Sequence, residues 1–384
     1  MSLSISLRGK ELTALSASIL GRITSTPCEP RADHILKLEK IPRDADLRGY
    51  AGVVTADNSG AVPLSQGKVP VVYAVTGLEA LADGDVVSLT PGGNIRSLYR
   101  IASPHNALFA TERCNSFCVM CSQPPRAVDD SSRIGEMLRL IDLIDPGTKE
   151  LGITGGEPTL LKNDLLRIVE RCKERLPSTA LHILSNGRLF YYGSFARNLA
   201  ALAHPDLMIG VPLYSDLDVE HDWVVQAAGA FDETMIGVQN LARFGVPVEI
   251  RVVIHRQTYQ RLPELAEFIY RNVPFAAHVA LMGLEIMGFA VANLEELWVD
   301  PADYQEELIS AVRFLARRGL NVSIYNHQLC VVPPGIWSFC RKSISDWKND
   351  YLPKCADCRA RDVCGGFFSS ALQRRVSRHI APIL

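Results

Sequence analysis

The sequence predicts an α/β protein in which a partial TIM-type (β/α)6 barrel lies between a small β-rich N-terminal domain and a cysteine-rich C-terminal region. From about residue 106, short apolar runs alternate with amphipathic stretches, which is typical of βα units around a parallel sheet. Residues 1–100 lack this alternation and are punctuated by Gly and Pro. Eight of the ten cysteines fall into two groups, at 114–121 and 330–364.

The expected elements follow in chain order. Runs at 50–55, 69–73 and 85–89 predict strands of the N-terminal domain, which either binds part of a substrate or covers the barrel. Helical spacing of Ile134, Met137, Leu138 and Ile141, and again of Leu265, Phe268 and Ile269, predicts amphipathic helices between the barrel strands. The barrel strands are expected at 106–110, 150–154, 180–184, 207–213, 248–254 and 278–283.

These elements predict three domains, with residues 1–100, 101–320 and 321–384. Six units are too few to close an eight-stranded barrel, so we expect an open barrel that can admit a bulky substrate, even a peptide. Ligands of parallel α/β folds lie at the carboxyl ends of the strands, where the loops converge. Functional residues are therefore expected in those loops.

Composition excludes several function classes. The chain has 384 residues, 47% of them hydrophobic, and a formal net charge of −2, which suits a protein with a well-buried core. No basic block provides an electrostatic footprint for nucleic acid. The N-terminus lacks the apolar core of a signal peptide, and no apolar run is long enough to span a bilayer. We therefore expect a cytoplasmic protein that binds neither nucleic acid nor membrane.

The most informative motif is C-x3-C-x2-C, formed by Cys114, Cys118 and Cys121. A structural zinc site would require a fourth Cys or His at finger-like spacing, and a thioredoxin-like pair would not explain Cys114. Three thiolates hold three irons of a cubane 4Fe-4S cluster and leave the fourth iron open to an external ligand. The sequence Thr-Gly-Gly-Glu-Pro at 154–158 follows the next predicted strand.

This pair of motifs, in this order, resembles radical S-adenosylmethionine (SAM) enzymes. The resemblance implies a 4Fe-4S cluster whose open iron binds SAM, with reductive cleavage to methionine and a 5′-deoxyadenosyl radical that abstracts a substrate hydrogen. It also implies an electron donor such as flavodoxin or ferredoxin. The protein then positions the reactants and excludes water, and no side chain is assigned as a catalytic acid or base.

Residues at the strand ends are candidates for contact with SAM. The two glycines of the 154–158 motif allow close approach of the backbone, and its Glu assists or only orients the turn. The turns after the third and fourth strands carry hydroxyl and amide groups suited to a ribose or carboxylate, with ordinary turn chemistry as the alternative. An Arg facing the barrel interior, on the same side as His255, would suit the SAM carboxylate. The expected cofactor residues are Gly155, Gly156, Glu157, Ser185, Asn186, Ser215 and Arg251.

The C-terminal cysteines predict an auxiliary 4Fe-4S cluster, with a structural zinc knuckle as the competing interpretation. The first motif favours iron, because the same protein is already matured with such clusters. The expected ligands are Cys330, Cys355, Cys358 and Cys364, with Cys340 as a spare or alternate.

A closer resemblance is to the HxsC family of radical SAM maturases of the His-Xaa-Ser system. It covers about residues 84–370 and depends on the segments 118–125, 248–255, 325–330 and 343–349, the last being the most specific. The resemblance implies modification of a ribosomally made His-Xaa-Ser repeat precursor peptide alongside a second radical SAM maturase. The alternatives are a radical SAM cyclase or dehydrogenase acting on a small molecule or nucleotide, and a non-catalytic iron-sulfur protein.

Overall fold

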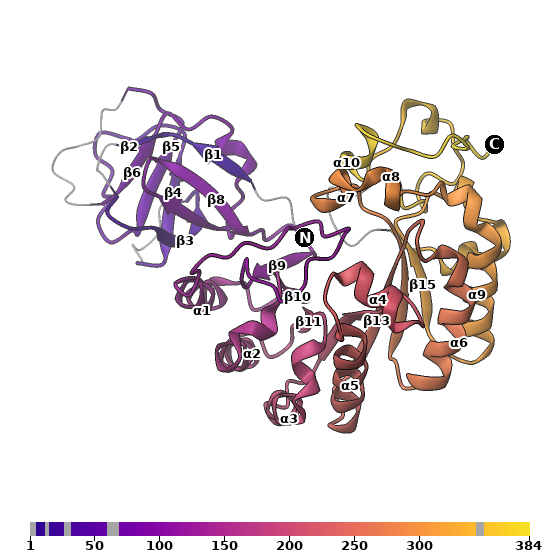
Figure 1. Cartoon of the computed structure of the whole chain (residues 1–384). Coiled ribbons are helices and arrows are strands. Elements are labelled where there is room, and N and C mark those ends of the chain that lie inside the picture. Colours follow the sequence, from indigo (N-terminus) through magenta and orange to yellow (C-terminus); the bar gives the residue numbers. More distant parts are fainter. Residues whose placement is uncertain (1–4, 12–14, 27–31, 60–68, 343–348) are drawn as a thin grey trace. The chain divides into compact units, whose positions relative to one another are not determined.

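A computed structural model describes residues 5–11, 15–26, 32–59, 69–342 and 349–384 (Figure 1). The chain forms two compact units. One contains Met1–Leu108, Ser132–Leu151 and Arg171–Thr179, and the other contains Phe109–Ser131, Gly152–Glu170 and Ala180–Leu384. Among the described residues, no helix is long and apolar enough to cross a membrane.

The N-terminal strands form one eight-stranded mixed sheet in the order β1-β8-β7-β3-β4-β5-β6-β2. The strands at its two ends are joined by a single residue, Gly9, whose backbone N donates a hydrogen bond to the O of Gly93 (2.9 Å). A Cβ on Gly9 would lie 2.6 Å from the O of Tyr73, so only glycine fits this corner. The sheet therefore curls back on itself, and the expected strand-rich N-terminal region is confirmed. Its strands are β1 Ser6–Arg8, β2 Lys10–Glu11, β3 Ile19–Thr24, β4 His34–Leu38, β5 Gly52–Thr55, β6 Val71–Tyr73, β7 Val86–Thr90 and β8 Asn94–Tyr99.

The second sheet has seven strands in the order β15-β14-β13-β12-β11-β10-β9, and from β11 to β15 neighbouring strands are parallel. All six strands expected from the sequence are present, so the α/β fold with a partial parallel barrel is confirmed. The additional strand, β15, is buried at three consecutive positions, so the sequence shows no alternation there. The strands are β9 Asn106–Phe109, β10 Glu150–Thr154, β11 Ala180–Leu184, β12 Leu207–Pro212, β13 Val248–Ile254, β14 His278–Gly283 and β15 Val322–Tyr325.

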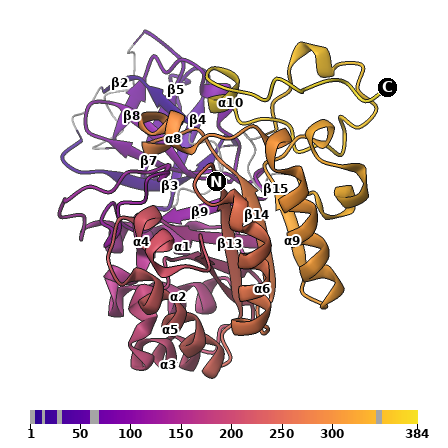
Figure 2. The ribbon, with the colours of Figure 1, turned by 45° about the vertical axis from the view of Figure 1, so that its right-hand side comes forward.

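Amphipathic helices connect these strands, and α6 and α9 pack side by side (Figure 2). The expected helical stripes are confirmed, because Met137 and Ile141 of α1 and Leu265 and Ile269 of α6 are buried. The helices are α1 Arg133–Leu143, α2 Asn163–Arg175, α3 Gly193–Ala201, α4 Asp218–Val225, α5 Ala230–Arg243, α6 Leu262–Asn272, α7 Phe289–Ala292, α8 Leu294–Leu297, α9 Gln305–Arg317 and α10 Ser369–Leu372.

The two faces of β13 have different environments. Ile250, Val252 and Ile254 are at most 2% exposed and form the apolar face. Arg251 and Val253 are half-buried on the opposite face, and Val253 packs against an apolar cluster that includes residues of the first cysteine motif. Side chains on this second face of β13 therefore lie on the side of the sheet that carries the candidate site.

After β15 the chain is mostly irregular, with short 3-10 turns and α10 (Figure 1). This region contains the second group of cysteines. The segment 343–349, the most specific part of the HxsC resemblance, lies outside the described residues except for Asn349.

Candidate functional site

The cysteine loop, residues 114–121, is anchored at its entry by Asp130, which is 6% exposed. Asp130 Oδ2 accepts hydrogen bonds from Thr111 Oγ1 (2.8 Å) and from the backbone N of Glu112 (2.6 Å). Its Oδ1 accepts one from Arg113 Nε (3.2 Å). A buried carboxylate is stable only with such donors, so these bonds fix the path of the chain into the loop.

The turn after β10 packs against the same entry segment. The backbone N of Gly156 donates to the O of Thr111 (2.7 Å), and that of Glu157 donates to the O of Arg113 (2.8 Å). A Cβ on Gly156 would lie 2.1 Å from the O of Arg113, and one on Gly155 would lie 2.5 Å from the O of Thr111. The glycines therefore allow a close approach between this turn and the cysteine loop.

The three thiols of the loop lie in poorly hydrated surroundings and affect one another's ionisation. Burial, followed by repulsion from the other two thiols, raises the pKa of Cys118 to about 12. Burial, followed by the charge of the nearby Glu157 carboxylate, raises the pKa of Cys114 to about 11. Burial also raises the pKa of Cys121. Cys118 packs against an apolar cluster that contains Met120.

Glu157 joins the turn after β10 to the turn after β11. Its carboxylate is 1% exposed and accepts hydrogen bonds from Ser185 Oγ (2.8 Å) and from the backbone N of Asn186 (2.6 Å). It also accepts from the N and Oγ1 of Thr159 (2.9 and 2.6 Å). Burial raises the pKa of Glu157, while these donors oppose that rise. The carboxylate and the Ser185 hydroxyl are thus engaged in turn chemistry, one of the two roles expected from the sequence.

Ser215, after β12, is engaged in the same way. Its hydroxyl is 1% exposed, donates to Glu220 Oε2 on α4 (2.6 Å) and accepts from the backbone N of Leu217 (3.2 Å). Its contacts therefore fix the start of α4.

Arg251 belongs to a charged cluster on β13 and β14. Its guanidinium donates to Glu249, and its other end lies 3.3 Å from Met282 Sδ. Glu249 Oε2 lies 2.7 Å from His278 Nδ1, and Oε1 lies 3.6 Å from His182 Nε2. Although burial opposes it, the hydrogen bond with His278 and the charge of Arg251 lower the pKa of Glu249 to about 2. A thioether is a weak acceptor, so one end of the guanidinium remains able to bind a stronger anion.

His255, expected on the same face as Arg251, is completely buried. Neither ring nitrogen has a hydrogen-bond partner among the described residues. Burial lowers its pKa to about 4, so the imidazole is neutral at physiological pH.

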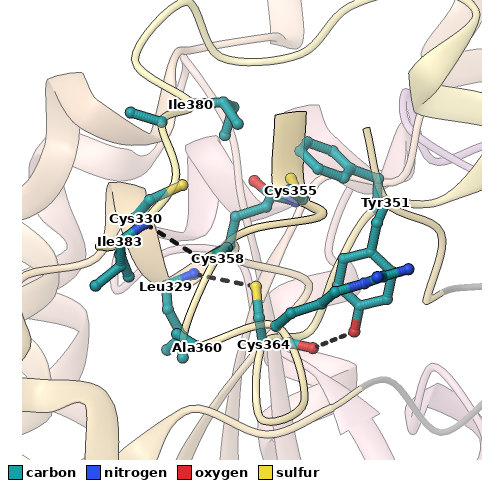
Figure 3. A pocket seen from close by; sticks show the side chains of 13 residues that line it. Leu329, Cys330, Tyr351, Cys355, Cys358, Ala360, Cys364, Ile380 and Ile383 are labelled. Carbon is teal, nitrogen blue, oxygen red and sulfur yellow. Dashed lines mark hydrogen bonds between the residues drawn. The ribbon is translucent and has the colours of Figure 1, made fainter. Parts of the chain in front are cut away.

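A second site lies in the C-terminal region, where a pocket partly open to solvent is lined by four of the cysteines (Figure 3). The backbone N of Leu329 lies 3.4 Å from Cys364 Sγ, and that of Ile383 lies 3.4 Å from Cys358 Sγ. Such N–H···S bonds are among the features that set the properties of iron-sulfur clusters. The lining cysteines are Cys330, Cys355, Cys358 and Cys364.

Cys340 is not among the residues that line this C-terminal pocket. Its Sγ lies 3.9 Å from the O of Ile336, and burial, followed by the nearby Cys364, raises its pKa to about 12. The four cysteines expected as ligands thus line one pocket, whereas Cys340, the expected spare or alternate, packs against the apolar cluster that contains Cys364.

Comparison with known proteins identifies the barrel. Residues 108–269 match the family described as the Radical SAM superfamily. This match covers the barrel region from β9 to α6 and supports membership of that superfamily. Radical SAM proteins use a 4Fe-4S cluster and SAM, as the motifs of this chain imply.

Two proteins similar in sequence to this chain carry names that indicate different substrates. A GTP 3′,8-cyclase of Rhodococcus opacus is 25% identical over 227 residues, which are 56% of this chain and 58% of the relative. A PqqA peptide cyclase of Granulibacter bethesdensis is 26% identical over 215 residues, which are 55% of this chain and 54% of the relative. This chain thus matches little more than half the length of either relative.

Among solved structures, SuiB of Streptococcus suis bound to SAM has 18% sequence identity and a TM-score of 0.45. The similarity covers 60% of this chain and 52% of SuiB.

The cysteine loop fits a radical SAM cluster by the chemistry of its donors. Thiolates are the ligands that iron-sulfur clusters prefer, and three half-buried thiols within electrostatic reach of one another would be unfavourable as anions without a cation. In the described part of the chain, no three Cys, His, Asp or Glu side chains form a group that could hold a single metal ion.

Sequence reasoning missed several residues that shape this radical SAM site. Asp130 stands in a polar stretch with no periodicity, and Glu249 and His278 stand on strands that otherwise look apolar. Arg188 contacts the cysteine loop, and its only signal is its position directly after the Asn186-Gly187 turn.

Proposed function

We propose that this radical SAM enzyme modifies a ribosomally synthesised His-Xaa-Ser repeat peptide. The observation that carries the proposal is the presence of two separate thiol sets, the cysteine loop and the C-terminal pocket lined by four cysteines. The HxsC resemblance of the segments 118–125 and 248–255 supports a peptide substrate, as does similarity to a protein named PqqA peptide cyclase.

Within this proposal, Cys114, Cys118 and Cys121 bind the cluster that receives SAM. The bound cluster and SAM supply the reductive cleavage that yields a 5′-deoxyadenosyl radical, and the chain positions the reactants. Arg251 binds the SAM carboxylate through the end of its guanidinium that now faces Met282. The remaining expected cofactor residues, from Gly155 to Ser215, shape the turns around SAM.

The four cysteines of the C-terminal pocket bind an auxiliary 4Fe-4S cluster. Its role is either to take back the electron after the new bond forms or to hold the substrate. The enzyme acts with a second radical SAM maturase of the same system and receives its electron from a donor such as flavodoxin or ferredoxin.

A second candidate is a cyclase or dehydrogenase acting on a small molecule or nucleotide. It is favoured by similarity to two proteins named GTP 3′,8-cyclase, both 25% identical to this chain. Both candidates require SAM cleavage, so the substrate distinguishes them.

The first test is cleavage of SAM to 5′-deoxyadenosine by anaerobically reconstituted protein with dithionite. The wild type should cleave SAM, and a variant with Cys114, Cys118 and Cys121 all changed to Ala should not. Cleavage by the triple variant would show that the catalytic cluster is assigned to the wrong residues.

The second test is incubation of the enzyme, reductant, SAM and partner maturase with a synthetic His-Xaa-Ser repeat peptide. Mass spectrometry should show a mass change in the peptide, with loss of hydrogens as the expected form. An unchanged peptide, in a reaction where SAM is cleaved and the partner is shown to be active, would favour the small-molecule candidate.

A further inference from the structure

Arg188 connects the cysteine loop to a barrel helix. It is the first residue of a 3-10 turn, Arg188–Tyr191, and its side chain is 13% exposed. Its Nη1 donates to the backbone O of Asn115 (2.5 Å) and to Ser116 Oγ (3.1 Å). Its Nε donates to Glu233 Oε2 on α5 (2.6 Å). One guanidinium therefore holds the loop at one edge and α5 at the other.

Asn186 reinforces this connection from the turn after β11. Its Nδ2 donates to Asn115 Oδ1 (2.6 Å), and its Oδ1 accepts from the backbone N of Arg188 (3.1 Å). Its own backbone N donates to Glu157 Oε2 (2.6 Å). An unbroken set of hydrogen bonds thus runs from the turn after β10, through Asn186, to the cysteine loop.

The two loop residues held in this way stand between the first and second cysteines. Asn115 and Ser116 are the residues after Cys114, and Ser116 is 2% exposed. A loop that bears metal ligands loses conformational entropy when it orders, and prior bonds to a rigid element reduce the loss on metal binding. The planar guanidinium suits this role, because it donates in several fixed directions and remains charged when buried.

We propose that Arg188 is a positioning residue that holds the segment Cys114–Cys118 in its cluster-binding conformation before iron arrives. Its positive charge at the loop also favours the reduced, more negative state of the cluster. The inference rests on the proposed function, since it takes these cysteines as the ligands. Glu233 fixes the guanidinium of Arg188, and the side chain of Asn186 holds Asn115.

The test compares full-length wild type with Arg188→Gln, Arg188→Lys and the control Arg197→Gln, since Arg197 is an exposed residue of α3. In the iron-free proteins, hydrogen exchange of residues 114–118 should be about tenfold faster in Arg188→Gln, which loses hydrogen bonds from a charged donor. Exchange in β13 should be unchanged, which distinguishes a local effect on the loop from global unfolding. Arg188→Lys should recover part of the protection, because an ammonium still reaches one acceptor, and Arg197→Gln should match the wild type.

A second readout uses the reconstituted proteins. The midpoint potential of the cluster should be more negative in Arg188→Gln and close to wild type in Arg188→Lys. The proposal would be overturned if residues 114–118 of Arg188→Gln exchanged hydrogen at the wild-type rate, or if the midpoint potential of its cluster were unchanged. If Arg188→Gln does not fold, Glu233→Gln removes the anchor instead and should give the same local increase in exchange. If wild-type protein binds no iron and cleaves no SAM, the proposed function fails, and the exchange result is independent of that outcome.

Discussion

Replacing Gly156 with Ala tests the close approach between the turn after β10 and the entry of the cysteine loop. The new Cβ would lie 2.1 Å from the O and 2.6 Å from the C of Arg113, and both are backbone atoms that cannot rotate away. Relief requires the turn to move, which breaks the bonds from Gly156 to Thr111 and from Glu157 to Arg113. Two backbone hydrogen bonds contribute about 1 kcal/mol each, and overpacking costs roughly 1–3 kcal/mol. The free energy of unfolding should therefore fall by about 3–5 kcal/mol.

Urea titration followed by circular dichroism measures this loss, and SAM cleavage should fall with it because the cysteine loop is displaced. The matched control is Gly135→Ala in α1, where a Cβ would meet nothing within 4 Å. That change should stabilise the protein by roughly 0.5–1 kcal/mol, since Ala is the better helix former. An unfolding free energy for Gly156→Ala within 1 kcal/mol of the control would refute the proposed backbone approach.

Three further outcomes are expected. Of Cys358 and Cys340, only Cys358 lines the C-terminal pocket. Cys358→Ala should therefore lose about four irons per chain, whereas Cys340→Ala should retain them. Elemental analysis measures the iron content, and finding zinc instead of these four irons would contradict the auxiliary cluster. Burial lowers the pKa of His221, His255 and His327 from 6.5 to about 4, so the unfolded chain takes up their protons first as pH falls. Each of these histidines should lower the free energy of unfolding by about 2 kcal/mol between pH 7 and pH 5. Urea titrations at the two pH values measure this loss, and equal urea midpoints would contradict burial of the neutral imidazoles. Neither ring nitrogen of His255 has a hydrogen-bond partner among the described residues, so His255→Phe should leave the free energy of unfolding unchanged or raise it. A fall of more than roughly 2 kcal/mol in urea titration would show that the imidazole makes a polar contact.

The barrel strands could be predicted because their pattern is local. A strand such as β13 carries buried residues on one face over its whole length, and that periodicity is visible without knowledge of its neighbours. The same reasoning predicted the stripes of α1 and α6. It failed for β15, whose first three residues are all buried, so that it lacks the alternation seen in β9, a strand of the same length.

The polar contacts of the site could not be predicted in this way, because they join positions far apart in the chain. Arg188 and the Asn115 carbonyl are 73 residues apart, and only the packing of β11 beside the cysteine loop brings them together. Ser185 looked equally suited to a cofactor or to a turn. Its hydrogen bond to Glu157, in the turn after β10, is what engages its hydroxyl within the protein.

These bonds also explain how the candidate site can keep a defined geometry while its cysteines stand on a loop. The second half of the cysteine loop packs Met120 into an apolar cluster, whereas the segment before Cys118 depends on polar partners from other elements. Asp130 fixes its entry, the turn after β10 packs against the same segment, and Arg188 and Asn186 hold its middle. Because Glu157 belongs to the turn after β10 and also accepts a hydrogen bond from Asn186, substitutions at Glu157 and Asn186 should act on one unit, and their effects on cluster retention should be less than additive. A double variant that lost as much iron as the sum of the two single variants would show that the turns support the loop independently.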